Sequence, residues 1–598
     1  MSFHVVAYAV LGSLGDSLAR SWKGLYEDIR AAGMRVYPPA YASAVLLTSV
    51  IVGVAATILS LLVASLLPVD GFRIALAVIA FFLSSGLAFI LGMSYPSLKK
   101  HLRSYKFDLE VPYLAAYVTT MATGGISPYI SMERLAKAPK YLFEVIREEA
   151  AKFYLRVRAL GEDPLTAIEE LAKDVPNRAY RQLMLGYAAT LRVGGDVVHY
   201  LQRQTEIMLR ERVSQVKAIG ERVSMLLEAY LAIALILALV IYVMNAVNFM
   251  LAQAGLGTTG SEAQLFLFGY LLLPMISGLF IYLADMMQPK YPVYDKTPYL
   301  VYLASSLPLI LILFIGTTLP FLIGVEPSSI PALKPLTPFS EFTSNIRILL
   351  GLPRGFESGL GMALSLMVGT LPAVLADAYS SAKHGGVQYG ITRFLRDMVE
   401  VRKTGLSPEK CIVNLRERDY GKFSPFLREI SNQVGWGVPL SVIFDKFAKR
   451  VKNWVALITM FLLVESIEVG GGTPEILEAL ASYAEDLEQV EKEKRSALKP
   501  LMLVPYVGAV ILVVVVLVIV GFMNYIVGLA GAAIGAASMI SIFVPPVVLN
   551  CYLMGLVAGK VSAERVSAGF KHAVLLMLMS LAAMTLTPHI VKGLAVKL

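Results

Sequence analysis

The chain has 598 residues and a formal net charge of +9; 56% of its residues are apolar and only 16% are charged. Soluble globular chains average about 45–50% apolar and about 25% charged residues, so much of this chain must face lipid. Two cysteines, Cys411 and Cys551, exclude a disulfide framework and any zinc or iron–sulfur site built on cysteines. The composition also excludes intrinsic disorder, fibrous repeats and a secreted enzyme. It indicates a polytopic membrane protein.

In chain order, a polar leader at 1–40 comes first, and it shows no convincing cleavage site for a signal peptide. A helix needs about 20 mostly apolar residues to cross a bilayer. Nine stretches meet this length: 41–67, 74–93, 226–250, 263–286, 298–324, 359–378, 501–527, 530–557 and 571–592. The predicted layout is therefore the leader, two spans within 41–93, a polar domain at 94–225, three spans within 226–324, an external loop at 325–358, one span at 359–378, a second polar domain at 379–500 and three spans within 501–598.

The distribution of lysine and arginine predicts the orientation in the membrane. With the N-terminus inside, the inside segments hold 47 of the 53 lysines and arginines, and the outside segments hold 6. Cytoplasmic segments carry the excess of these residues. We therefore expect a plasma-membrane protein with the N-terminus and both polar domains in the cytoplasm and the C-terminus outside.

Two landmarks recur in the polar domains in the same order and at nearly the same separation. At one constant shift along the chain, Gly125, Ser127, Pro128 and Leu135 match Gly405, Ser407, Pro408 and Leu415. At a slightly smaller shift, Val193, Gly194 and Gly195 match Val469, Gly470 and Gly471. About the same shift carries spans three to five onto spans seven to nine. Because each copy holds four spans, an even number, the two copies point the same way in a parallel repeat.

The landmarks predict helix ends. Glycine tolerates a left-handed backbone after one helix, serine caps the next helix, and proline fits its first position. Between the landmarks, Pro164-Leu165 is matched with Pro439-Leu440. The apolar helix faces of this region comprise Leu165, Ile168, Leu171 and Ala172 in the first domain and Leu440, Ile443, Phe444 and Phe447 in the second. We expect about six amphipathic helices per polar domain and no strand, so the fold class is all-α.

The sequence shows few residue patterns typical of phosphate, metal, catalytic or nucleic-acid-binding sites. The paired glycines favour a helix break over a phosphate loop, because no GxxxxGK[ST] motif occurs and neither run follows a strand. The six histidines show no metal-ligand spacing, so we predict no metal, no cofactor and no catalytic residue. No pattern indicates nucleic-acid binding. Three tryptophans, Trp22, Trp436 and Trp454, fall in the predicted cytoplasmic segments and are interpreted as core or domain-contact anchors.

The paired glycine–serine–proline landmarks and the later valine–glycine–glycine landmarks resemble the F domain of type II secretion systems. Two such domains in a nine-span chain resemble the archaeal platform protein of type IV pilus-like filaments, including the archaellum. The resemblance implies a non-enzymatic platform in the cell membrane that docks a separate hexameric secretion ATPase on its cytoplasmic side. It further implies that pilin-like subunits are partners. The platform is expected to be a homodimer.

Arg192, Arg402 and Lys403 flank the landmarks and are the candidate residues for docking the ATPase. The long helices that lead from each paired glycine toward spans three and seven are candidate levers. The loop 325–358 contains Pro327, Ser328, Ser329 and Pro331, and it is interpreted as a loop in preference to an envelope contact.

Two other classes of function stay open. A secondary transporter or channel with parallel repeats needs polar residues within its spans, and Glu228, Asp285 and Asp377 lie near span ends. A membrane-embedded hydrolase needs a nucleophile with a base or a metal set, and the sequence shows neither. The platform is the favoured prediction.

Overall fold

The computed structural model describes residues 3–66, 73–253, 266–324, 334–529 and 533–595, and every regular element within these ranges is a helix. Nine helices of the described ranges are long and apolar enough to cross a membrane, which confirms the predicted number of spans and the all-α class. Parts of the predicted spans and of the predicted loop lie outside the described ranges, namely residues 67, 263–265 and 530–532, and Pro327, Ser328, Ser329 and Pro331.

The chain divides into two compact units. The first comprises Met1–Met208 with Glu465–Leu480, and the second comprises Leu209–Val464 with Ala481–Leu598.

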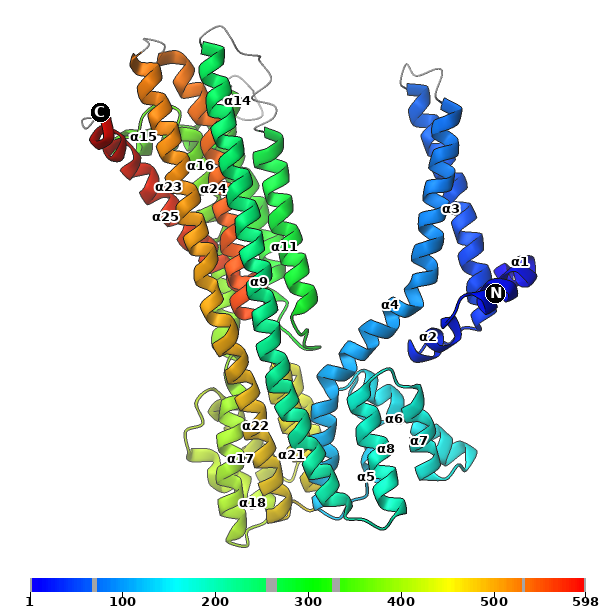
Figure 1. The fold of residues 1–598 in the computed structure, drawn as a ribbon. Coiled ribbons are helices and arrows are strands. Elements are labelled where there is room, and N and C mark those ends of the chain that lie inside the picture. Colours follow the sequence, from blue (N-terminus) through cyan, green and yellow to red (C-terminus); the bar gives the residue numbers. More distant parts are fainter. Residues whose placement is uncertain (1–2, 67–72, 254–265, 325–333, 530–532, 596–598) are drawn as a thin grey trace. The chain divides into compact units, whose positions relative to one another are not determined.

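The first unit contains the leader, two spans and most of the first polar domain. Its helices are α1 (Phe3–Ser21), α2 (Leu25–Ala31), α3 (Pro38–Leu66), α4 (Arg73–Thr123), α5 (Pro128–Leu135), α6 (Val145–Leu160), α7 (Pro164–Asp174), α8 (Arg178–Arg192) and the start of α9 (Val197–Gln253). The second span and the first helix of the polar domain are one helix, α4, which is bent (Figure 1). Pro96 and Pro112 lie inside α4, and each removes a backbone hydrogen bond.

The leader is helical and is held to α4. The Lys100 Nζ lies 2.9 Å from the Asp28 Oδ1, which ties α2 to α4. The Tyr41 hydroxyl donates a hydrogen bond of 2.6 Å to the carbonyl of Gly92, which joins the start of α3 to α4. The leader therefore positions a short helix between the first span and the first polar domain.

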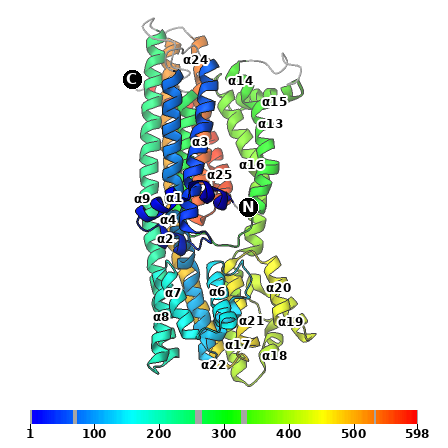
Figure 2. The same cartoon turned by 90° about the vertical axis from the view of Figure 1, so that its right-hand side faces the viewer.

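The second unit contains seven spans and most of the second polar domain. Its spans lie on α9, on η1 (Leu267–Leu272) with α11 (Leu273–Met287), on α12 (Thr297–Val301), η2 (Tyr302–Ser306) and α13 (Leu307–Thr317), on α16 (Glu357–His384), on α23 (Leu503–Leu529), on α24 (Ala533–Ala563) and on α25 (Gly569–Ala595). The polar-domain helices are α17 (Val387–Lys403), α18 (Pro408–Asn414), α19 (Ser424–Gly435), α20 (Leu440–Arg450), α21 (Trp454–Glu468) and α22 (Pro474–Leu498), although the end of α21 and the start of α22 belong to the first unit. Figure 2 shows α17 to α20 gathered beyond one end of the long apolar helices of this unit.

Equivalent residues of the two copies meet inside the second unit. A Cβ built on Gly220 would lie 3.1 Å from the Cβ of Ala497, and one built on Gly508 would lie 2.6 Å from the Cδ2 of Leu231. The separation along the chain is the same in both pairs and is nearly that of the landmarks. Residues that contact their own counterparts lie on a two-fold axis. Gly220 comes before Leu231 on α9, and their partners Ala497 and Gly508 follow in the same order along the α22–α23 run. These helices are therefore parallel, which confirms the parallel repeat.

Small residues allow α24 and α25 to pack with their backbones in close contact. A Cβ on Gly559 would lie 2.0 Å from the backbone nitrogen of Gly569, and one on Gly555 would lie 2.3 Å from the Cα of Ala573. Gly555 and Gly559 form a GxxxG motif, which brings membrane helices together in this way.

The segment 325–358 differs from the prediction of a loop. Within its described part, α15 (Thr337–Leu349) is helical and follows a short 3₁₀ turn at Lys334–Leu336. Pro338 occupies the first turn of α15, where its missing N–H costs no hydrogen bond. The Arg347 Nε lies 2.9 Å from the Glu357 Oε1 at the start of α16, so this helix is tied to the sixth span.

Candidate functional site

The serines of the first landmark cap the helices that follow them. The Ser127 hydroxyl accepts a hydrogen bond of 3.4 Å from the backbone nitrogen of Ile130, and the Ser407 hydroxyl accepts one of 3.4 Å from Lys410. Pro128 and Pro408 begin α5 and α18. The glycines before the serines have left-handed backbones, with φ of +77° at Gly125 and +91° at Gly405. Each landmark therefore makes the same tight connection between two helices.

The paired glycines of the second landmark also end helices. The Gly195 N–H donates to the carbonyl of Thr190 at 2.9 Å, and the Gly472 N–H donates to the carbonyl of Ser466 at 3.0 Å. These bonds satisfy carbonyls at the ends of α8 and α21. Gly194, Gly471 and Gly472 have left-handed backbones, whereas Gly195 and Gly470 do not, so Gly194 and Gly471 are the first left-handed glycines after their helices. The structural counterpart of Gly194 is therefore Gly471, one residue later than the predicted match with Gly470.

The match between Pro164 and Pro439 is likewise one residue out of register. Pro164 is the first residue of α7, whereas Pro439 precedes the first residue of α20. The two faces coincide when Pro164 is matched with Leu440 instead. The buried residues are Ala167, Ile168, Leu171 and Ala172 in α7, and their counterparts Ile443, Phe444, Phe447 and Ala448 are buried in α20 together with Leu440. Burial fixes the register because a shift by one residue turns a helix by about 100°.

A polar contact missed in the sequence recurs in both domains. The Asn177 side chain caps α8 by accepting from Tyr180, and the Asn453 side chain caps α21 by accepting from Ala456. The same side chains donate hydrogen bonds of 2.6 Å to Asp108 Oδ1 and to Gln388 Oε1, respectively. The partners lie on the first helix of each domain. The asparagine recurs at the same shift as the buried faces of α7 and α20, and this recurrence is the sequence signal that points to the contact.

The three candidate docking residues differ in their surroundings. The Arg402 Nη1 donates a hydrogen bond of 2.9 Å to the carbonyl of Leu406, so this side chain stabilises the first landmark turn of the second domain. Lys403 is exposed beside it, with its Nζ 3.9 Å from Glu400. Arg192 lies at the end of α8 in the first unit, with its Nη2 2.9 Å from the Glu169 Oε2 and its side chain 53% exposed.

Apolar side chains are exposed in both polar domains. Beside Arg192, Val193 is 87% exposed and Leu191 is 44% exposed. In the second domain, Trp436 is 78% exposed, whereas Trp454 is buried. Trp454 is therefore a core anchor, and Trp436 is not. Exposed tryptophan is typical of surfaces that bind a protein partner.

A buried cluster of charges connects α22 to two loops of the second unit. The Lys494 Nζ lies 3.0 Å from the Glu491 Oε1, 2.9 Å from the Glu564 Oε2 and 4.5 Å from the centre of the Tyr291 ring. Tyr291 donates a hydrogen bond to Glu491 and stacks on Trp454 with ring centres 5.2 Å apart. We call these five residues the Lys494 cluster. It ties the end of α22 to the connection between spans four and five and to the connection between spans eight and nine.

No direct sign of the Lys494 cluster is visible in the sequence, because Lys494 stands in a run of charges typical of an exposed helix face. Packing brings Lys494 together with Tyr291, which lies in a distant part of the chain. The three acids near span ends do not form a common site. Asp285 pairs with Lys560 at 2.7 Å and with Lys290, Asp377 is buried on α16, and Glu228 is exposed on α9.

Comparisons with known proteins identify the polar domains. The family described as "Type II secretion system (T2SS), protein F" matches residues 114–244 and 394–521. Both matches run from the first helix of a polar domain into the span that follows the domain. An uncharacterized protein of Methanocaldococcus jannaschii is 22% identical over 415 residues, which cover 68% of this chain and 67% of that protein. No solved structure matches the chain.

The two matched regions include both copies of both landmarks. Proteins of this family are membrane platform proteins of type II secretion and type IV pilus systems. The chain is therefore similar to the type II secretion system F family in two regions, which recur as a parallel repeat, and nine helices of its described residues are long and apolar enough to cross a membrane.

Proposed function

We propose that this protein is the membrane platform of an archaeal type IV pilus-like machine. In this proposal, its F domains bind a hexameric secretion ATPase in the cytoplasm, and its spans guide pilin-like subunits into a growing filament. The protein acts as a homodimer in the cell membrane, with the N-terminus inside and the C-terminus outside. It transmits mechanical work and performs no catalysis of its own.

The observation that carries this proposal is the way helices join the F domains to the spans. The helix α9 extends without interruption over Val197–Gln253, and α22 continues through a 3₁₀ turn at Lys499–Met502 into α23 (Figure 1). A continuous helix transmits displacement along its axis because its backbone hydrogen bonds resist stretching. The Lys494 cluster would pass a displacement of α22 to the connections that follow spans four and eight.

The docking surface is proposed to include one basic residue and neighbouring apolar side chains in each F domain. In the first domain these are Arg192 and Val193, and in the second they are Lys403 and Trp436. Arg402 is assigned to the turn instead, because its guanidinium is engaged by the carbonyl of Leu406. The charges would set the orientation of the ATPase, and the exposed apolar side chains would supply contact area.

A binding experiment with the full chain in lipid nanodiscs tests this proposal. The partner is a secretion-type ATPase encoded near the gene, and binding and ATP turnover are both measured. We expect the chain to bind the ATPase, and we expect Lys403→Glu or Arg192→Glu to weaken binding at least about tenfold. The matched control is Lys449→Glu on α20, an exposed lysine of the second domain, which should leave binding unchanged.

Absence of ATPase binding by the wild-type chain, together with substrate-dependent ion flux in liposomes, would favour the transporter instead. Equal weakening by Lys403→Glu and Lys449→Glu would show that net charge, and not the proposed surface, controls binding. For the orientation, cysteines placed at Gly125 and Gly405 should both react with thiol reagents from the cytoplasmic side. Labelling from opposite sides would contradict the proposed arrangement.

A further inference from the structure

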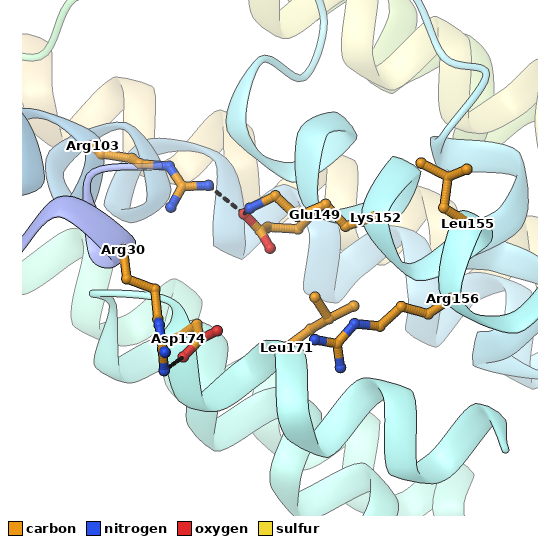
Figure 3. A pocket seen from close by; sticks show the side chains of 8 residues that line it. All are labelled: Arg30, Arg103, Glu149, Lys152, Leu155, Arg156, Leu171 and Asp174. Carbon is orange, nitrogen blue, oxygen red and sulfur yellow. Dashed lines mark hydrogen bonds and ion pairs between the residues drawn. The ribbon is translucent and has the colours of Figure 1, made fainter. Parts of the chain in front are cut away.

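A charged cavity of about 300 Å³ lies between the leader and the first F domain. Its charged side chains converge from α2, α4, α6 and α7 (Figure 3). They are Arg30, Arg103, Glu149, Lys152, Arg156 and Asp174. Four cations therefore face two carboxylates, which leaves an excess of two positive charges in one cavity. Neither the platform function nor the family match assigns a role to this cavity.

The inner wall of the cavity is rigid. The Arg103 guanidinium forms an ion pair with Glu149, and these side chains are only 8% and 2% exposed. The Arg103 Nη1 also donates a hydrogen bond of 2.9 Å to the carbonyl of Ala31 at the end of α2. Gly33 leaves room for this contact, because a Cβ at this position would lie 3.2 Å from the Arg103 Cζ. Arg103 therefore joins the leader to α6 and fixes the shape of the wall.

Of the remaining cations, Lys152 has a close partner, whereas Arg30 and Arg156 are held more loosely. The Lys152 Nζ lies 2.8 Å from Glu149, but a lysine ammonium carries three N–H donors. The Arg156 Nη1 lies 3.7 Å from Glu162, and the Arg30 Nη1 lies 3.5 Å from Asp174. Both distances exceed the usual range for an N–H···O hydrogen bond. Arg30 and Arg156 can therefore turn toward a ligand without losing a strong partner, and Lys152 can donate to a ligand while it keeps its contact with Glu149.

We propose that this cavity binds a phosphate-bearing anion. A phosphomonoester carries about two negative charges and three acceptor oxygens at neutral pH, which match the excess charge and the available donors. The ligand would connect Arg30 of the leader with Lys152 and Arg156 of α6. Two sources supply this chemistry: the headgroup of a membrane lipid, since α2 directly precedes the first span, and a soluble phosphate compound. This inference does not depend on the proposed ATPase coupling.

The test uses the full chain in nanodiscs and separates the two sources. One arm adds inorganic phosphate or pyrophosphate to nanodiscs of phosphatidylcholine and measures binding by calorimetry. The other arm compares the melting temperature of the protein in phosphatidylcholine with that in mixtures containing phosphatidic acid. Binding in the first arm identifies a soluble ligand, and stabilisation only in the second identifies a lipid headgroup.

Variants distinguish the cavity from general charge effects. Lys152→Met combined with Arg156→Gln should weaken phosphate binding at least about tenfold, or abolish stabilisation by phosphatidic acid. The matched control is Arg158→Gln, because Arg158 lies slightly further along α6, pairs with Glu133 at 3.1 Å and does not line the cavity. The control should behave as the wild type. Failure of both arms in the wild type, or an equal loss in the control, would overturn the proposal.

Discussion

Lys217 and Lys494 are equivalent residues of the two copies, with the same separation along the chain as Gly220 and Ala497, but their surroundings differ. Lys217 is 56% exposed and lies 3.4 Å from Glu493, whereas the Lys494 side chain is 8% exposed between two carboxylates. Removing one partner of a buried ion pair strongly lowers the free energy of unfolding, because the remaining charge stays buried without a partner. Duplication has therefore placed the same side chain in a surface pair and in a buried cluster.

This difference predicts unequal effects of the same substitution. Lys494→Met should lower the free energy of unfolding by about 3–5 kcal/mol, since Glu491 and Glu564 lose their shared cation. Lys217→Met should cost no more than about 1 kcal/mol, as expected of an exposed pair. Thermal or denaturant unfolding of the full chain in detergent checks both values. Similar costs at the two positions would contradict the asymmetry.

The buried carboxyl of Glu465 is expected to make the stability of the first unit depend on pH. Its side chain is 15% exposed, and its Oε2 lies 3.7 Å from the Arg134 Nη1. Burial raises the pKa of the Glu465 carboxyl above its usual value, and Arg134 opposes part of this rise. The folded protein therefore binds this proton more tightly than the unfolded chain. The stability contributed by Glu465 is present below the usual carboxyl pKa and is lost as the pH rises through the raised value.

Glu465→Gln should remove this loss. The melting temperature of the variant minus that of the wild type should become larger as the pH is raised from 5 to 8, in measurements at constant salt. Glu475→Gln, at an exposed carboxylate of α22, is the control, and its difference from the wild type should not change with pH. A constant difference between wild type and Glu465→Gln across this range would show that the Glu465 carboxylate is fully ionised throughout.

At the scale of elements, close helix contacts depend on single glycines. Gly559→Leu should separate α24 from α25, because any Cβ at this position meets the backbone of Gly569. We expect a cost of about 3 kcal/mol or more, since backbone cannot move aside as a side chain does. Gly278→Leu on α11 is the control, because a Cβ there meets no atom within 4 Å. Comparable unfolding curves for the two variants would exclude tight packing of α24 on α25.

At the scale of the whole molecule, the two copies meet around the axis marked by Gly220 and Ala497. The Cβ–Cβ separation of 3.1 Å is slightly below that of natural disulfides, about 3.5–4.5 Å, so a small adjustment permits a bond. The double variant Gly220→Cys/Ala497→Cys should form a disulfide under mild oxidation, detectable by peptide mapping. Gly220→Cys/Val507→Cys is the control, because Val507 lies beyond Ala497 on the α22–α23 run by about 15 Å, at about 1.5 Å per residue. Efficient bonding in the control and none in the first pair would refute the proposed axis.

The membrane class, the nine spans, the helical F domains and the positions of the landmark turns could all be predicted from the amino-acid sequence. Each of these depends on local properties: a run of apolar residues long enough to cross lipid, a serine that caps its own helix, or a glycine that permits a left-handed turn. Duplication was also visible, because matching residues recur at a nearly constant shift. Its register was wrong by one residue at Pro164 and Pro439, since prolines mark helix starts less strictly than buried faces do.

Only the three-dimensional packing determines which charges are buried and which helices contact each other. The Lys494 cluster, the Asn177 and Asn453 contacts and the cavity beside Arg103 all join residues that are far apart in the chain. In the sequence these residues are indistinguishable from ordinary surface residues or helix caps. Packing in the folded structure buries them away from water. This is so because desolvation and ion pairing depend on neighbours in space, whereas helix formation and membrane crossing depend mainly on neighbours in sequence.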